Sequence, residues 1–295
     1  MISSWGRRSP LPTRQLSMKT VAVLNFKGGV GKTTFTACVA QALAMAGQRI
    51  LVIDNDYQHN LSSLLGVTPS KPNIRDVYLA SIGIGGKTLA GAIQKSPIPG
   101  VEVVTSTTDL ANGDVKDVQQ LEKCIQFAKL ETTFDHIFID NSPGLDRLQE
   151  AALHACDGIL APTELAHSAI SGVYEMHRML AKKFQGESQI AKVVPYFYRG
   201  TKTQDSFRAA LEKLLPGKVT STAIPWDVAF EHSVEQRKIL VLQHLSSNVV
   251  SHYLELIREV FGIDEKKVAA IMRQRVREEA LQRLNRRTGD RKSVV

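Results

Sequence analysis

Residues 26–34 read Phe-Lys-Gly-Gly-Val-Gly-Lys-Thr-Thr, and they separate an apolar run at residues 21–24 from a helix-like stretch at residues 33–46. A strand, a glycine-rich turn and a helix start form a cradle for phosphate, because backbone N–H groups and the helix N-terminus converge on the anion. Lys32 supplies a full positive charge, and the Thr33 hydroxyl stands where it can ligate Mg²⁺. The stretch therefore predicts a site for a nucleoside triphosphate.

The loop departs from the generic motif G-x-x-x-x-G-K-[ST], because Phe26 holds the place of the first glycine. A second lysine, Lys27, stands just ahead of the double glycine. The alternative interpretation is a glycine-rich turn with two solvated lysines. The strand before the loop, the helix after it and the adjacent Lys32 and Thr33 favour the phosphate loop.

The remaining apolar runs indicate the fold class. Near-continuous apolar strands that alternate with helices are typical of a parallel sheet covered on both faces. We therefore predict an α/β fold, a doubly wound and mostly parallel sheet of the P-loop NTPase kind, with ligands at the carboxyl ends of its strands. The strands are expected at residues 21–24, 50–53, 101–104, 137–139, 159–161, 193–197 and 219–224.

The net charge of +8 is concentrated at the two ends of the chain. Residues 1–18 hold three arginines and no acid, and residues 262–295 hold ten basic and five acidic residues. Residues 19–261 are formally neutral and are expected to form one domain. We expect residues 1–18 to be a disordered extension, with Met18 as an alternative start, and residues 262–295 to be a basic helix and tail. Such charge suggests nucleic acid or an anionic membrane surface.

Other features of the chain bear on its location. No apolar run is long enough for a membrane span, and the N-terminal residues lack the apolar stretch of a secretory signal. Cys38, Cys124 and Cys156 are scattered and form no C-x-x-C pair. Buried free thiols in a reducing cytosol are the expected state.

Acidic residues follow two of the predicted strands. Asp54 and Asp56 follow the run at residues 50–53, and Asp140 follows residues 137–139. In a doubly wound sheet these carboxylates lie near the phosphate loop, where they can hold Mg²⁺ or orient an attacking water. Each acid alone could equally cap the next helix. Their occurrence together in a chain with a phosphate loop favours the metal and catalytic roles.

The chain resembles the ParA/MinD group of deviant Walker ATPases, and most of all ParA-type partition ATPases without an N-terminal DNA-reading domain. Residues 27–34 match the group's phosphate loop, and residues 54–60 resemble its D-x-D-P-Q-G-N segment, with Tyr57 for proline and His59 for glycine. Residues 134–140 resemble its Walker B strand, and residues 223–225 its late loop near the adenine. The resemblance covers about residues 19–240.

The resemblance implies roles for these residues, with ATP and Mg²⁺ as cofactors. Lys32 would bind the β- and γ-phosphates, and Thr33 would ligate Mg²⁺, with Asp54 and Asp140 supporting the metal through its water shell. Asp56 would orient the hydrolytic water, and Lys27 would reach the partner's ATP across a dimer, much as an arginine finger does. The implied nucleotide-binding residues are Lys27, Gly28, Gly29, Val30, Gly31, Lys32, Thr33, Thr34, Pro225 and Asp227.

DNA contacts are expected from basic residues late in the chain. Residues 224–229 read Ile-Pro-Trp-Asp-Val-Ala where many relatives read I-P-R-N-V-R, so two arginines are absent. Trp226 is expected to pack at the dimer surface rather than to stack on a base. Arg237 and Lys238 can supply the missing charge, as can Arg273 and Arg277 of the C-terminal helix. Solvated helix faces are the alternative for both pairs.

We thus predict a cytoplasmic, nucleoid-associated ATPase that forms a homodimer with ATP, binds DNA non-specifically and is activated by a ParB-like or other partner protein. Its expected role is DNA partition or cargo positioning through slow hydrolysis. A membrane-associated MinD-like ATPase is disfavoured, because the C-terminal helix does not separate apolar and cationic faces. A metal-cluster carrier would need ligating cysteines. A non-catalytic ATP-binding regulator stays open.

Overall fold

The computed structural model describes residues 19–81, 88–186, 188–230, 239–242, 245–274 and 277. Several sequence predictions lie outside these residues: the extension at residues 1–18, the DNA contacts Arg237 and Lys238, and most of the tail after residue 277. Helical backbone runs over residues 265–274 and at 277, as expected for the first part of the C-terminal helix.

A single sheet of eight strands organises the described chain, in the order β3-β4-β2-β5-β1-β6-β7-β8. All neighbouring strands are parallel except β3 and β4. The predicted α/β fold is therefore confirmed. The strands are β1 (Thr20–Val23), β2 (Ile50–Asn55), β3 (Ile93–Lys95), β4 (Val101–Val104), β5 (His136–Asn141), β6 (Gly158–Glu164), β7 (Ile190–Tyr198) and β8 (Ile224–Pro225).

The prediction of a strand at residues 219–224 was wrong. Only Ile224 of this range lies in a strand, while Val219 forms an isolated bridge with Val193. The backbone N–H groups of Ser221 and Thr222 donate to the carboxylate of Glu259 at 2.6 and 2.8 Å. A side chain thus takes the donors that a strand ladder would use. The short antiparallel β3 was not anticipated from the sequence.

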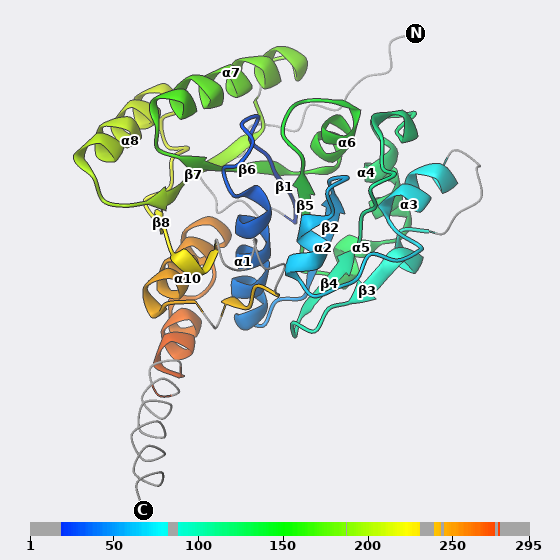
Figure 1. The fold of residues 1–295 in the computed structure, drawn as a ribbon, viewed down its shortest axis with the longest axis horizontal. Helices are drawn as coiled ribbons and strands as arrows, with labels where there is room; N and C mark the ends of the chain where they lie inside the picture. The colour runs from blue at the N-terminus through cyan, green and yellow to red at the C-terminus, as the bar shows by residue number, and fades with distance from the viewer. Residues whose placement is uncertain are drawn as a thin grey trace, which may run out of the picture.

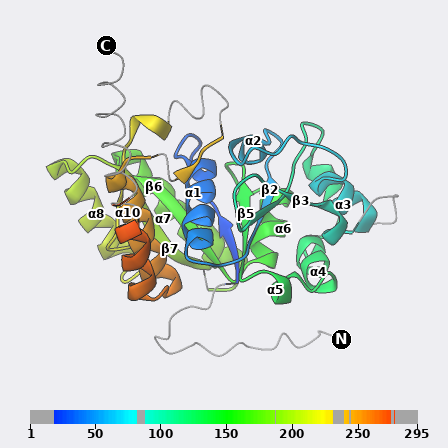
Figure 2. The ribbon, with the colours of Figure 1, turned by 90° about the horizontal axis from the view of Figure 1, so that it is seen from below.

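Two layers of helices cover the sheet, as its alternating side chains require. In β1, Val21 and Val23 pack with α1 (Lys32–Met45) and α10 (Ser247–Phe261), and Ala22 packs on the other face with α7 (His167–Lys183). Figures 1 and 2 show α1 beside α10, and α7 beside α8. The other helices are α2 (Asn60–Leu64), α3 (Ile74–Ser81), α4 (Gln120–Phe127), α5 (Leu130–Thr133), α6 (Arg147–Ala155), α8 (Lys202–Leu214) and the 3₁₀ turns η1 (Ala90–Ala92) and η2 (Asn112–Asp114).

Helix α1 begins directly after the glycine-rich loop, one residue earlier than predicted. It is buried on nearly all sides, because the sheet lies against one side and α10 against another. Its alanine-rich sequence suits that position, since small side chains allow close packing. The loop at the end of β1 is therefore fixed against the centre of the fold.

Candidate active site

The glycine-rich loop joins β1 to α1 at the carboxyl edge of the sheet. Gly29 and Gly31 have φ values of +74° and +79°, a left-handed conformation that favours glycine. Gly31 is also restricted by space, because a Cβ atom there would lie 2.6 Å from Cε1 of Tyr196 and 2.9 Å from Cζ of Phe197. The motif's glycine is thus needed both for the turn and for contact with β7.

Asn25 holds the loop at its start. Its side-chain amide donates to the carbonyl of Pro162 on β6 at 3.0 Å, and its Oδ1 accepts from the backbone N–H of Lys27 at 3.0 Å. At the other end, no side chain in the described part of the chain caps the N-terminus of α1. The N–H groups of its first turn point to a site that suits an anion.

Lys32 and Lys27 lie in different surroundings. Lys32 is buried and lines the pocket, and its Nζ donates to the carbonyl of Lys27 at 3.4 Å. Burial lowers the pKa of Lys32, while the carboxylates of Asp140 and Asp56 act in the opposite direction. Lys27 is half-buried, and its Nζ contacts the hydroxyl of Ser168, the second residue of α7, at 3.1 Å.

Asp54 and Asp140 lie side by side at the ends of β2 and β5, which pair in register at these residues. Both are fully buried. Asp54 Oδ2 accepts from the backbone N–H and the hydroxyl of Ser62 at 2.9 and 2.6 Å, and Asp140 Oδ1 accepts from the hydroxyl of Thr36 at 2.9 Å. Burial raises the pKa of each carboxyl to about 7, and the charge of Asp140 adds to the shift at Asp54.

These residues suit a hydrated Mg²⁺. Among the described residues, Asp54 Oδ1 and Asp140 Oδ2 are buried oxygens without a hydrogen-bond partner. Within that part of the chain, no three His, Cys, Asp or Glu residues gather as a closed metal site. A Mg²⁺ ion bound with a nucleotide needs no such cage, because phosphates and waters complete its shell. It would neutralise charge on the β- and γ-phosphates.

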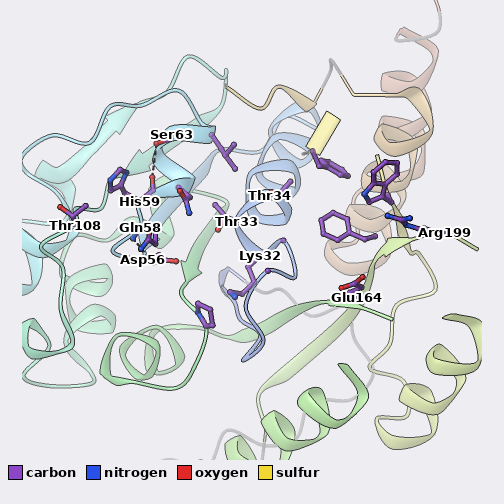
Figure 3. A pocket seen from close by; sticks show the side chains of 18 residues that line it. Lys32, Thr33, Thr34, Asp56, Gln58, His59, Ser63, Thr108, Glu164 and Arg199 are labelled. Atoms are coloured by element: carbon purple, nitrogen blue, oxygen red, sulfur yellow. Dashed lines mark hydrogen bonds between the residues drawn. The ribbon is translucent and has the colours of Figure 1, made fainter. Parts of the chain in front are cut away.

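The main pocket, of about 810 Å³, opens in front of the phosphate loop. Its two ends differ in character. Figure 3 shows Asp56, Gln58 and His59 on one side, Arg199 on the other, and Lys32 and Thr33 between them. The lining residues away from the loop are Asp56, Gln58, His59, Asn60, Ser63, Leu64, Thr108 and Pro143 at the first end, and Glu164, Phe197, Arg199, Trp226 and Phe230 at the second.

The segment after β2 carries the departures from the family pattern. His59 takes the place of glycine and has a φ of +43°, so it keeps the left-handed backbone that a glycine would adopt without strain. Its N–H donates to the carbonyl of Asp56 at 2.9 Å, and one carboxylate oxygen of Asp56 accepts from the N–H of Gln58 at 3.0 Å. The loop thus keeps a turn, and Asp56 still lines the pocket.

The late loop contributes one residue, Trp226, to the described lining of the pocket. Neither Pro225 nor Asp227 is among the described residues that line the pocket; Pro225 lies in β8. The carboxylate of Asp227 accepts from the Ser246 hydroxyl at 2.6 Å and from the Ala229 N–H at 2.9 Å. Trp226 lines the pocket, and its packing at a dimer surface stays a prediction.

Sequence reasoning also missed the other residues of the second end. Phe197, Arg199 and Phe230 carry no local motif, and Glu164 only ends an apolar strand. They meet because β6, β7 and β8 are neighbours in the sheet and end at the same edge. Arg273 and Arg277 of the C-terminal helix are both exposed.

The fold and the pocket together define a P-loop nucleotide-binding protein: a parallel sheet, a glycine loop before a buried helix, a lysine in the pocket and buried carboxylates on the neighbouring strands. The family described as "AAA domain" matches residues 18–191.

Known proteins narrow the class further. The chain is 26% identical to the chromosome partitioning protein ParA of Caulobacter vibrioides over 85% of this chain and 97% of that protein. It is 30% identical to a ParA family protein of Chlamydia trachomatis over 82% of this chain and 97% of that one. The structure of a Cyanothece McdA variant in complex with ATP superposes with a TM-score of 0.70 at 22% identity, over 84% of this chain and 98% of that one.

The chain therefore belongs to the ParA/MinD-type ATPases, as its motifs indicated. It is an ATPase whose cofactors are ATP and Mg²⁺. In the part of the chain that the structure describes, no helix is long and apolar enough to cross a membrane.

Proposed function

We propose that this ATPase is a nucleotide-dependent dimer switch for DNA partition or cargo positioning. The ATP-bound dimer binds DNA non-specifically, and a ParB-like or other partner protein stimulates hydrolysis and releases it. The γ-phosphate of ATP shifts the equilibrium toward the dimer, and its loss on hydrolysis shifts the equilibrium back. The unit that performs this cycle comprises residues 19–261, and it works in the cytoplasm on the nucleoid.

The contrast between the two loop lysines carries this proposal. Lys32 enters its own pocket, whereas Lys27 is not among the described residues that line it. Among the described residues, the Lys27 ammonium meets only the hydroxyl of Ser168, at 3.1 Å. Its charge can serve phosphate chemistry by reaching the nucleotide of a second copy, which is how a charge delivered in trans acts.

Within one pocket the roles divide by position. Lys32 and the first-turn N–H groups of α1 bind the β- and γ-phosphates, and the Thr33 hydroxyl ligates Mg²⁺, while Asp54 and Asp140 hold the metal's waters. Asp56 orients the attacking water from the edge of the pocket. Hydrolysis stays slow in a single chain, because the second positive charge is absent until the dimer forms.

Lys27→Ala tests the dimer switch. We expect ATP affinity within about threefold of wild type, with loss of ATP-dependent dimerisation in light scattering and of hydrolysis, since charge supplied in trans is worth roughly 10³-fold or more. Lys19→Ala is the matched control, because the Lys19 ammonium bonds the Glu131 carbonyl at 3.1 Å, outside the nucleotide pocket. Survival of binding, dimerisation and hydrolysis in Lys27→Ala would refute the proposal.

We further propose that Arg273 and Arg277 contact DNA. Val268, Ile271 and Met272 pack this helix against the core, while both arginines, four residues apart, are exposed. Arg273→Glu with Arg277→Glu should lower DNA affinity and flatten its dependence on salt. Lys123→Glu on α4, where the lysine pairs with Asp117, is the control.

DNA binding should be measured with ATP, with ADP and without nucleotide, at two salt concentrations. The switch requires tight binding with ATP alone, with a steep loss of affinity as salt rises. Equal DNA affinity with ATP, with ADP and without nucleotide would contradict the proposed switch. Hydrolysis unchanged by Asp56→Ala would instead support the non-catalytic regulator.

A further inference from the structure

A pair of buried asparagines lies directly behind the acidic residues of the site. Asn55 and Asn141 are the last residues of β2 and β5, and they pair in register, one position after Asp54 and Asp140. Successive side chains of a strand point to opposite faces. The aspartates therefore face α1 and α2, whereas the asparagines face α3 and α6 on the other side of the sheet.

The two side-chain amides form a chain of hydrogen bonds across three strands. Asn55 Nδ2 donates to Asn141 Oδ1 at 3.0 Å. Asn141 Nδ2 donates in turn to the carbonyl of Ile139 at 2.9 Å and to that of Val23 on β1 at 3.3 Å. Since β2, β5 and β1 are neighbours in the sheet, this chain ties the ends of both acid-bearing strands to the strand that leads into the phosphate loop.

Two helices hold Asn55 from its other side. The hydroxyl of Tyr78 on α3 donates to Asn55 Oδ1 at 3.0 Å, and Asn55 Nδ2 also donates to the carbonyl of Leu148 on α6 at 3.0 Å. Asn55 and Tyr78 are fully buried, and Asn141 is 1% exposed. The Asn55 amide thus uses its oxygen and both of its N–H donors. A buried polar network that is fully bonded in this way is rigid and specifies one arrangement.

The network ends where an exposed loop begins. Asp56 follows Asn55 directly and is half-buried, and the next two residues, Tyr57 and Gln58, are exposed. The Asp56 carboxylate lines the pocket and accepts from the N–H of Gln58 at 3.0 Å. That bond lies within the loop, so it does not fix the loop relative to the sheet. Asn55 is therefore the last anchored residue before Asp56.

We propose that Asn55 and Asn141 are a positioning pair for ATP hydrolysis, which holds the Asp56 carboxylate at a fixed place relative to the phosphate loop. The inference rests on the proposed function, in which Asp56 orients the attacking water. A group that orients water acts over hydrogen-bond distances, so a displacement of about 1 Å can cost roughly 100-fold in rate. Neither asparagine is among the described residues that line the pocket, so the pair acts through Asp56 rather than on the nucleotide.

The test replaces both amides at once, on the full chain with ATP and Mg²⁺. Asn55→Leu with Asn141→Leu keeps the side-chain volumes similar and leaves neither amide facing a lost partner. We expect an ATP dissociation constant within about threefold of wild type by calorimetry, and ATP-dependent dimerisation retained in light scattering. Single-turnover hydrolysis should fall by roughly 10- to 100-fold.

Tyr78→Phe is the milder variant, which decides the matter if the leucine pair does not fold. It keeps the ring and removes one donor from Asn55, so hydrolysis should fall by roughly 2- to 10-fold, the equivalent of one hydrogen bond, at unchanged ATP affinity. Thr220→Val is the matched control, because the buried Thr220 hydroxyl donates to the carbonyl of Thr222 at 2.6 Å, outside the described pocket lining. It should leave the hydrolysis rate unchanged.

A further readout separates positioning from a merely structural role. In an Asp56→Ala background the amide substitutions should lower the residual rate by less than about twofold, because they act through that carboxylate. Unchanged hydrolysis in the amide variants would overturn the inference, and so would ATP affinity that falls in parallel with hydrolysis. Hydrolysis unchanged by Asp56→Ala alone would instead refute the proposed role of Asp56, so the two failures are distinguishable.

Discussion

The phosphate end of the pocket comes from one continuous stretch, residues 26–34, whereas the aromatic end takes Phe197, Trp226 and Phe230 from segments that are neighbours only in space. The phosphate end uses backbone N–H groups, and its sequence is restricted by backbone conformation. The aromatic end uses side chains placed by a strand bulge. The first is therefore visible as a motif, and the second becomes visible only when the sheet is formed.

The two ends meet at one residue. Gly31 belongs to the phosphate loop, and the rings of Tyr196 and Phe197 lie directly against it. A substitution in the phosphate loop can therefore disturb the packing of these rings, and a substitution of a ring can disturb the loop. The predictions that follow test how strongly the two parts depend on each other.

The largest effect is expected at Gly31. Gly31→Ala adds a methyl group that would lie 2.6 Å from Tyr196 Cε1, at a φ of +79°. We expect a loss of about 3 kcal/mol or more in the free energy of unfolding, from overpacking and backbone strain together. Urea denaturation measures it. Gly29→Ala is the control: its φ is +74° but nothing lies within 4 Å of the added Cβ, so a loss of about 1–2 kcal/mol is expected. Equal losses would show that the ring contact is unimportant.

Gln41 of α1 offers the next test, because it ties the phosphate-loop helix to the late part of the chain. Its Nε2 donates to the carbonyl of Leu240 at 2.7 Å, and its Oε1 accepts from the N–H of Leu242 at 2.8 Å. Gln41→Leu leaves both backbone groups buried without these partners, and should cost about 2–3 kcal/mol of stability in urea. Gln126→Leu, on the exposed side of α4, should cost little. A loss below about 0.5 kcal/mol at Gln41 would contradict the tie.

The third prediction concerns pH and the nucleotide-free protein. The folded state raises the pKa of Asp54 from 3.8 to about 7. The folded protein therefore binds more protons than the unfolded chain between these values, so this group's contribution is complete below about pH 4 and is lost as the pH rises through 7. Asp54→Asn should reduce the fall in unfolding free energy between about pH 4 and 7 by up to about 1.4 kcal/mol per pH unit. Identical pH profiles would refute the assignment.

The smallest effect is expected at His59. Its left-handed backbone, with φ at +43°, costs energy that glycine does not incur. His59→Gly should therefore raise the free energy of unfolding by about 0.5–1 kcal/mol, after the greater flexibility of glycine in the unfolded chain is offset. Thermal unfolding would show a rise in Tm. His59→Ala keeps the Cβ and should bring no such gain; a gain of the same size there would point to the imidazole rather than the backbone.

Much of the architecture could be predicted because its signals are local. The apolar run at residues 50–53 is followed by Asp54 as part of the same strand, at the carboxyl edge of the sheet where its acid was expected. Strand prediction failed at residues 219–224, where Glu259, far away in the sequence, takes the backbone donors. A run of β-branched residues cannot show that competition.

The late loop teaches the same lesson. The resemblance to relatives predicted nucleotide contacts at Pro225 and Asp227. In the structure the carboxylate of Asp227 accepts a hydrogen bond from the hydroxyl of Ser246 at 2.6 Å, close to the start of α10. Trp226 lies in the pocket because β8 ends beside β7. Arg199, which directly follows β7, places its guanidinium over the Trp226 ring. Neither contact has a sequence period or spacing that would indicate it.

The sequence by itself determined the phosphate loop, the buried strands that flank it and the acidic residues at their ends, because backbone conformation and burial act on adjacent residues. Tertiary structure alone decided which aromatic rings line the pocket, which carboxylates lie together in a buried corner, and which lysine is left outside its own pocket. Those outcomes depend on the order of strands and on one extra residue in β7, and both are settled only when distant segments pack together.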